Sequence, residues 1–373
     1  MNLKSKIVDH VKNIGGFKTS RKIVVFSVDD YGNVRLDSKE AKSRLISGGI
    51  KLKSHFDNFD SMETREDLEV LFECLTSVRD KNNNPAVFSP FALPCNIDFY
   101  RMKRNKYEEY IYENLDQTFQ RLENQDHNAY GGTWRIWKEG IKLGLLRPQF
   151  HGREHLNLKV LSENLEKKDY ITKLCLENYS YAGILNHVYP SISYTAAFDF
   201  WELEENKAFE NIITSGVESF TEVFGYQPIQ FNAPGATASS LINKYLFQNG
   251  IKFIDNPFLK SEHLGLGHYK KSLNYTGKNI YPGLTNLNRN VVFEPTEGSR
   301  DWVTFAMRQI EIAFKCKKPA IISSHRVNFC GNIDEGNRQI GIHSLKNLLK
   351  NIIGRWPDVE FLSSEDLCKI IRN

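Results

Sequence analysis

The stretch KIVVFSVDDYG, residues 22–32, decides what kind of fold this chain adopts. Its first part, KIVVFSV, is almost continuously apolar, whereas a strand with one solvated face would alternate apolar and polar side chains. A continuous apolar run is typical of a strand that is covered on both faces, as in a parallel sheet. Asp29 and Asp30 follow directly, and adjacent carboxylates at a strand end can serve different purposes, one facing a metal and the other a substrate.

Similar apolar runs predict further strands at residues 86–91, 146–150, 228–233, 252–256, 290–295, 319–324 and 359–364. Helical patterns lie between them, at 65–79, 107–122, 207–224, 239–248, 302–314 and 344–353. This alternation predicts an α/β barrel or an open doubly wound sheet. We expect one domain over residues 1–373, with a barrel core at about 22–368 and a helical, aromatic insertion at about 92–145.

The composition argues against a nucleic-acid-binding or membrane-spanning protein. The net charge is +4, the pI is near 8.5, and the basic residues are spread along the chain. The first residues contain no apolar signal-peptide core, and the six cysteines form no CxxC pair, so we expect reduced thiols in a cytoplasmic protein. A thin apolar stripe near the N-terminus predicts a short helix packed on the barrel, or alternatively one lying on a membrane surface: Leu3, Ile7, Val11 and Ile14.

Two histidines follow the predicted strand at 146–150, in the sequence PQFHGREHLN. His151 and His155 are four residues apart, a spacing that lets two imidazoles hold one ion from one face of a helical turn. Two histidines and one carboxylate leave metal positions open for water and substrate, as a catalytic site requires. The alternatives are structural histidines and, for Asp29 and Asp30, a surface turn.

HGREH also matches the H-x-x-E-H pattern of inverzincin peptidases, in which Glu154 would be the base. That pattern needs a regular helix, and both Pro148 and Gly152 disfavour one here.

Two later segments also follow predicted strands. In FNAPGATASS (231–240), Pro234 and Gly235 predict a tight loop whose backbone N–H groups could line an oxyanion hole or simply connect a strand to a helix. In PAIISSHRVNFCG (319–331), His325 could protonate a leaving group, or it could be a structural histidine. We expect Asp199 to add a polar contact to the substrate, and aromatic residues nearby either to stack on sugar rings or to pack the insertion: Trp134, Trp137, Tyr189, Phe200 and Trp201.

These segments, in this order, resemble the motifs of the NodB-like polysaccharide deacetylases, carbohydrate esterase family 4. Asp29-Asp30 resembles the first motif, and the stretch from His151 to His155 resembles the second. The loop from Asn232 to Gly235 resembles the third, and His325 resembles the last. The resemblance spans about residues 22 to 368 and implies a distorted (β/α)7-8 barrel.

The resemblance also implies roles for these residues. Asp29 would be the general base and His325 the general acid. One divalent metal ion, zinc by default with iron, cobalt or nickel as alternatives, would be held by Asp30, His151 and His155. A backbone N–H near Tyr31 would help to stabilise the oxyanion.

The chain departs from the family pattern in two places. The third motif usually carries an arginine that orients the base, where this chain has Asn232. Conversely, Arg326 follows His325, and we expect Arg326 to orient the base from another strand, to bind a substrate anion or to hold a carboxylate.

The sequence therefore predicts a metal-dependent hydrolase that removes an acyl group, acetyl foremost, from a carbohydrate by means of metal-activated water. A catalytically impaired carbohydrate-binding barrel is one alternative, favoured by Asn232. A metal-dependent amidohydrolase of a non-sugar substrate is the other.

Overall fold

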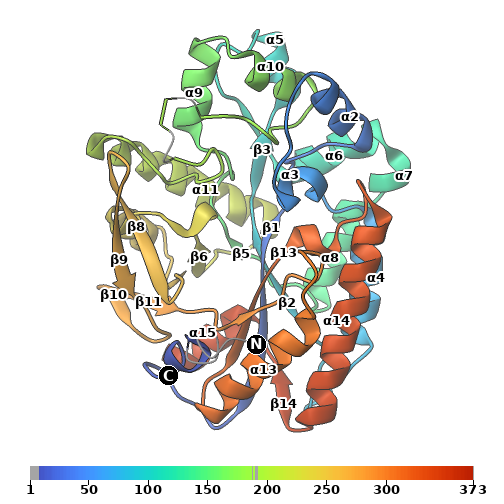
Figure 1. The fold of residues 1–373 in the computed structure, drawn as a ribbon, viewed down its shortest axis with the longest axis vertical. Helices are drawn as coiled ribbons and strands as arrows, with labels where there is room; N and C mark the ends of the chain where they lie inside the picture. Colours follow the sequence, from blue (N-terminus) through green and yellow to red (C-terminus); the bar gives the residue numbers. More distant parts are fainter. Residues whose placement is uncertain (1–7, 187, 190–191, 373) are drawn as a thin grey trace.

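The computed structural model describes residues 8–186, 188–189 and 192–372, and a curled sheet lies at its centre (Figure 1). Each of the predicted apolar runs forms a strand of this sheet: β1 (Lys22–Tyr31), β2 (Phe88–Ala92), β5 (Gln149–Phe150), β6 (Gln230–Asn232), β7 (Phe253–Asp255), β12 (Val291–Val292), β13 (Ala320–His325) and β14 (Val359–Phe361). Two further strands extend one edge, β10 (Asn279–Tyr281) and β11 (Leu284–Leu287).

The 10 strands run in the order β10-β11-β7-β6-β5-β2-β1-β13-β12, and β14 pairs with the first residues of β1. Every pair is parallel except β10 with β11. No pairing among the described residues joins β12 to β10, so the barrel stays open at that seam. Because parallel strands share their carboxyl ends, the residues that follow β1, β5, β6, β7 and β13 converge at one end of the barrel.

Helices cover the outside of the sheet, and their apolar faces complete the core. They are α4 (Arg65–Thr76), α6 (Leu115–Gln125), α8 (Thr133–Lys142), α11 (Ala208–Phe224), α12 (Asn243–Gln248), α13 (Trp302–Lys315), α14 (Glu335–Arg355) and α15 (Ser364–Arg372). Shorter helices lie in the connections between strands: α2 (Lys39–Ser47), α3 (His55–Phe59), α5 (Phe99–Arg104), α7 (His127–Tyr130), α9 (Leu158–Glu166) and α10 (Tyr170–Glu177). In Figure 1, α5, α9 and α10 gather at the end of the molecule opposite β14.

The predicted insertion at 92–145 contains a hairpin as well as helices. A helix was expected over 107–122, but residues Tyr112–Asn114 form β4, which pairs with β3 (Cys95–Ile97), and the helix begins only at Leu115. The reason is local, because the Asn114 N–H donates to Gln117 Oε1 at 3.0 Å in a capping box that starts the helix there. A second hairpin, β8 (Leu259–Gly265) with β9 (His268–Leu273), was not predicted, because most of its residues are not buried and it has no apolar run.

The N-terminal segment contacts the barrel through a polar residue. Leu3 and Ile7 lie outside the described residues, whereas Val11 and Ile14 are 40% and 67% exposed, so these two do not form the predicted apolar contact. Asp9 instead accepts hydrogen bonds from Arg308 and Gln309 of α13 at 2.7 and 2.8 Å. All six cysteines are free thiols. Within the described part of the chain, no helix has both the length and the apolar character needed to cross a bilayer.

Candidate metal centre and active site

The end of β1 departs from regular strand geometry at its two aspartates. The pairing register with β2 shifts between Val28 and Tyr31, and Asp30 has a φ of 72°, in the left-handed region. In a regular strand, successive side chains point to opposite faces, so Asp29 and Asp30 would face different sides. The irregularity lets both carboxylates line one cavity of about 500 Å³ at the carboxyl ends of the strands.

Asp30, His151 and His155 come together in this cavity. The Asp30 Oδ1 atom lies 3.2 Å from His151 Nε2 and 3.0 Å from His155 Nε2, and one ligand atom from each residue lies within 4.8 Å of the others. Ligands about 2.0–2.2 Å from one tetrahedral ion are about 3.3 Å apart, so these spacings suit a shared cation. All three side chains are buried, and these three residues could hold one metal ion.

The hydrogen bonding of His151 leaves its Nε2 available to a metal ion. Its Nδ1 lies 2.8 Å from the backbone oxygen of Asn232, an acceptor, so Nδ1 carries the hydrogen. In the neutral ring, Nε2 then presents a lone pair toward the Asp30 carboxylate. A lone pair and a carboxylate repel each other, and either a proton on Nε2 or a metal ion bound by both removes the repulsion, so the contact suits a metal site.

The charge states of the ligands fit the same interpretation. Burial lowers the pKa of His155, although Asp30 opposes the shift, so the neutral imidazole that a metal needs is favoured. Burial would raise the pKa of Asp30, but the neighbouring histidines outweigh it and hold that pKa well below its usual range. The two histidines are not on a helix, as their spacing first suggested. They lie in an irregular loop after β5, where Gly152 has a φ of 107°.

Asp29 lies beside the triad and is held by Arg289, from the connection between β11 and β12. Two nitrogens of the guanidinium donate to the Asp29 oxygens at 2.7 and 2.8 Å, and its Nε donates to Asp255 at 2.8 Å. Burial raises the pKa of Asp29, but Arg289 more than compensates, so the pKa is lowered overall. Arg289 thus orients Asp29 and keeps it ionised.

His325 lies across from Asp29 at the end of β13. Its Nε2 is 3.8 Å from Asp29 Oδ2, and its Nδ1 is 2.8 Å from Glu294 Oε1. Burial opposes protonation, but Glu294 and the two aspartates raise the pKa of His325 to about 10. At neutral pH the histidine is therefore protonated while Asp29 is ionised.

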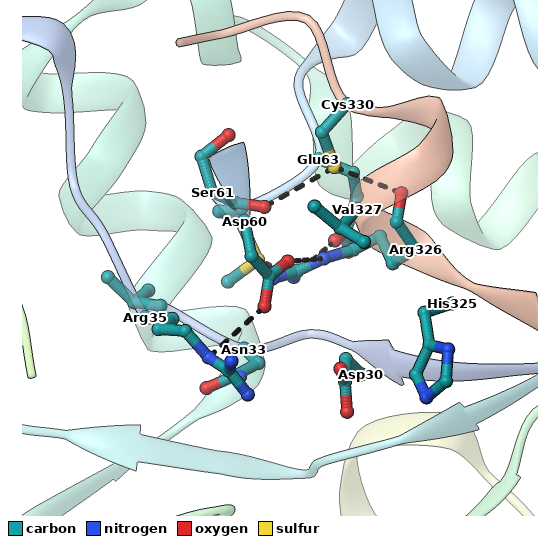
Figure 2. A network of polar contacts seen from close by, with 12 residues as sticks. Asp30, Asn33, Arg35, Asp60, Ser61, Glu63, His325, Arg326, Val327 and Cys330 are labelled. Atoms are coloured by element: carbon teal, nitrogen blue, oxygen red, sulfur yellow. Dashed lines mark hydrogen bonds and ion pairs between the residues drawn. The ribbon is translucent and has the colours of Figure 1, made fainter. Parts of the chain in front are cut away.

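Arg326 does not orient Asp29, contrary to the prediction. Its guanidinium is fully buried, where it donates to Asp60 at 2.7 and 3.2 Å and to Glu63 at 2.9 Å (Figure 2). Two carboxylates neutralise the charge that was expected to face the base. The arginine that the third motif lacks is supplied by Arg289 instead, and Asn232 contributes its backbone oxygen to His151.

Other predicted substrate contacts also lie away from the cavity wall. Tyr31 is 1% exposed and packs edge-on against Trp137, and Pro234 is buried while Gly235 and Ala236 line the cavity. The Ala236 N–H already donates to the Ala233 oxygen at 3.0 Å, so it is not free for an oxyanion.

Asp199 is buried and accepts a hydrogen bond from Thr237 at 2.7 Å, and burial raises its pKa to about 6. For the aromatic residues, stacking on sugars and packing were both left open: none of the five is in the described lining, Trp137 and Phe200 belong to the core, and Trp134 packs against it.

The peptidase alternative fails on the position of Glu154. Its carboxylate is 4% exposed and accepts hydrogen bonds from Arg153 at 2.7 Å and from Tyr110 at 3.1 Å. A general base must reach the attacking water, and this carboxylate is absent from the cavity lining in the described structure.

Several functional candidates were missed from the sequence. Arg289 directly precedes the predicted strand at 290–295 and Glu294 lies near its end, and their proximity to that strand was the only local signal. Phe56 and Arg35 lie in the long connection between β1 and β2, where no motif marked them, yet both line the cavity.

No protein-family profile matches the sequence, and no curated protein is detectably similar to it. Solved structures of similar fold include a candidate polysaccharide deacetylase from Mycobacterium smegmatis, at 12% identity and a TM-score of 0.45, covering 96% of this chain and 93% of that one. A candidate glycoside hydrolase/deacetylase from Parabacteroides distasonis has 10% identity and a TM-score of 0.49, and the match covers 95% of this chain and 72% of that one. An allantoinase has 9% identity and a TM-score of 0.47, and the match covers 94% of this chain and 90% of that one. In its fold, the chain is a distorted (β/α) barrel whose sheet is parallel apart from the β10–β11 pair.

Proposed function

We propose that this chain is a metal-dependent hydrolase that removes an acyl group, acetyl foremost, from a carbohydrate. The observation that carries the proposal is the pairing of an ionised carboxylate, Asp29, with a protonated imidazole, His325, 3.8 Å away, in the cavity that the Asp30–His151–His155 cluster also lines. Base and acid are in the protonation states that hydrolysis near neutral pH requires.

The chemistry follows from these side chains. Asp29 removes the proton from a water molecule in the cavity, and the water oxygen attacks the acyl carbon. A divalent cation bound by Asp30, His151 and His155 supplies Lewis-acid activation of oxygen. The bond from the acyl carbon to the leaving nitrogen or oxygen then breaks as His325 gives that atom its proton, and Glu294 stabilises the charged form of His325 beforehand.

The cavity suits a sugar in size and lining. Its volume of about 500 Å³ lies in the range of small-molecule sites. Phe56 forms part of the wall, with its ring 4.9 Å from that of His325 and at 82° to it. An apolar ring beside the acid offers a surface for the C–H face of a sugar held at the reacting centre.

Metal analysis and acetate release test the proposal together. We expect about one divalent ion per purified chain. The variants His155→Ala and Asp30→Asn should lose that ion. Asp29→Asn should keep it, but its acetate release should be nearly abolished. His343→Ala, on the exposed face of α14, is the matched control and should change neither.

Full acetate release by metal-free protein, or by Asp29→Asn, would contradict the proposal. Bound metal without release of acetate from any acetylated sugar would favour a non-sugar amidohydrolase or a binding barrel.

A further inference from the structure

Arg35 lies in the wall of the same cavity and takes no part in the chemistry above. It is 5% exposed, yet among the described residues none accepts a hydrogen bond from its guanidinium. Its nearest carboxylate oxygen, Asp60 Oδ2, is 3.4 Å from Nε, and neither atom has a hydrogen-bond partner. The Nε–H is a buried donor without a hydrogen bond, and an unsatisfied buried donor is costly, so a ligand that supplies acceptors to this guanidinium would be bound favourably.

Arg35 forms an ion pair with Asp60 but no hydrogen bond, because Arg326 also engages that carboxylate. Asp60 Oδ1 accepts two hydrogen bonds from Arg326, at 2.7 and 3.2 Å, so one carboxylate is shared between two guanidinium groups (Figure 2). Glu63 is also engaged, by Arg326 and by the indole N–H of Trp137. The amide nitrogen of Asn33, also drawn in Figure 2, is a second buried donor without a partner.

Arg35 is held in place rather than free to move to another partner. Its backbone oxygen accepts hydrogen bonds from the N–H groups of Tyr181 and Ala182, at 2.9 and 3.1 Å. Its guanidinium carbon lies 5.2 Å from the centroid of the Phe56 ring, whose other neighbour is His325. The wall therefore presents, in order, a cation, an apolar ring and the acid, with Asp30 between Arg35 and His325 in Figure 2.

We infer that Arg35 binds an anionic substituent of the acylated sugar, a carboxylate or a phosphate, so that the substrates are acidic acyl sugars. The inference rests on the proposed function for the sugar part of the ligand. The fork of the guanidinium matches the two oxygens of a carboxylate or a phosphate, and a charged acceptor restores the hydrogen bonds that Arg35 lacks.

Calorimetric binding to the metal-loaded protein tests the inference without turnover. The probes are glucose, glucuronate and glucose 6-phosphate, which differ in the presence and kind of anion. We expect at least one acid to bind 10-fold or more tightly than glucose, and the better acid identifies the group. Arg35→Gln should weaken its binding about 10- to 150-fold and leave glucose unchanged.

Two further variants serve as controls. Arg35→Lys keeps the charge without the fork and should retain part of the preference for the acidic sugar. It also provides a second variant to test if Arg35→Gln misfolds. Arg65→Gln, in an exposed pair with Glu69, should bind as the wild type does. Equal affinity for all three probes, or an unchanged preference in Arg35→Gln, overturns the inference.

Acetate release separates this inference from the proposed function. With N-acetylglucosamine, its 6-phosphate and N-acetylmuramic acid as substrates, Arg35→Gln should raise KM for the acidic sugars only. An equal loss of kcat on neutral and acidic sugars would place Arg35 at the reacting carbonyl and overturn the anion site. If no sugar releases acetate while Arg35 still determines the binding of acids, the proposed function fails and the anion site stands.

Discussion

At the scale of single residues, two charged pairs set the protonation of the groups proposed to react. Arg289 makes two hydrogen bonds to Asp29, and Glu294 makes one to His325. Both partners come from the short region around β12, so one segment controls base and acid together. Without these partners, burial alone would favour the neutral forms of both groups.

Arg289→Gln should lower kcat about 100-fold, because Asp29 loses the fork that fixes its orientation. Burial would then raise the pKa of Asp29, so the acid limb of the pH–rate profile should move to higher pH, since the base acts only when ionised. Arg289→Lys should restore part of the rate. An unchanged kcat and acid limb in Arg289→Gln would show that Arg289 does not position the base.

Glu294→Gln should shift the alkaline limb of the same profile to lower pH, by about one unit or more. The sign follows because Glu294 helps to raise the pKa of His325 to about 10, and the acid is active only while protonated. Activity at low pH should be retained, because His325 is protonated there in either protein. If the alkaline limb stays in place while kcat falls throughout, Glu294 has a purely structural role.

At the scale of elements, α14 holds the segment that follows His325. This segment is the short 3-10 helix η4 (Arg326–Phe329), and Asn328 within it donates to Glu294 at 2.6 Å. Gly341 of α14 packs directly against it, since a Cβ atom at Gly341 would lie 1.7 Å from the Asn328 backbone oxygen. The close approach of helix and turn therefore depends on one missing methyl group.

Gly341→Ala should destabilise the protein by about 1–3 kcal/mol, because the added methyl group forces α14 and η4 apart. Gly354→Ala is the matched control in the same helix: nothing lies within 4 Å of its added Cβ, so it should stabilise by about 0.5–1 kcal/mol. Urea unfolding measures both changes. Equal effects of the two substitutions on the free energy of unfolding would mean that η4 moves to accommodate the methyl group without destabilising the protein.

At the scale of the whole molecule, the proposed metal ion would connect β1 to the loop after β5. Asp30 and His151 lie 121 residues apart in sequence. They meet because β1 and β5 both pair with β2, which places the two strands close together in the sheet. A cation that binds only the folded chain stabilises it by mass action.

Chelation should therefore lower the unfolding temperature, and restoring zinc at 100 times its Kd should recover about 2.7 kcal/mol. In His155→Ala the chelator should have little effect, because the site has lost a ligand. Thermal unfolding monitored by circular dichroism measures the change. A wild-type unfolding temperature that is the same with and without chelator would argue against a bound ion.

The apolar runs determined eight of the ten strands of the central sheet, because a strand covered on both faces must be apolar throughout. The carboxyl ends of such strands meet at one edge, so the convergence of Asp30, His151 and His155 also followed from the sequence. Their role as metal ligands remains a prediction.

The tertiary structure alone decided which charges face the site. Arg326 adjoins His325 in sequence, yet Asp60 and Glu63, more than 260 residues away, neutralise it. Arg289 and Arg35 reach the cavity from connections whose course depends on how the whole chain packs. A side chain's charge can be read from the sequence. Whether an oppositely charged partner neutralises it depends on contacts between distant segments, which only the folded chain defines.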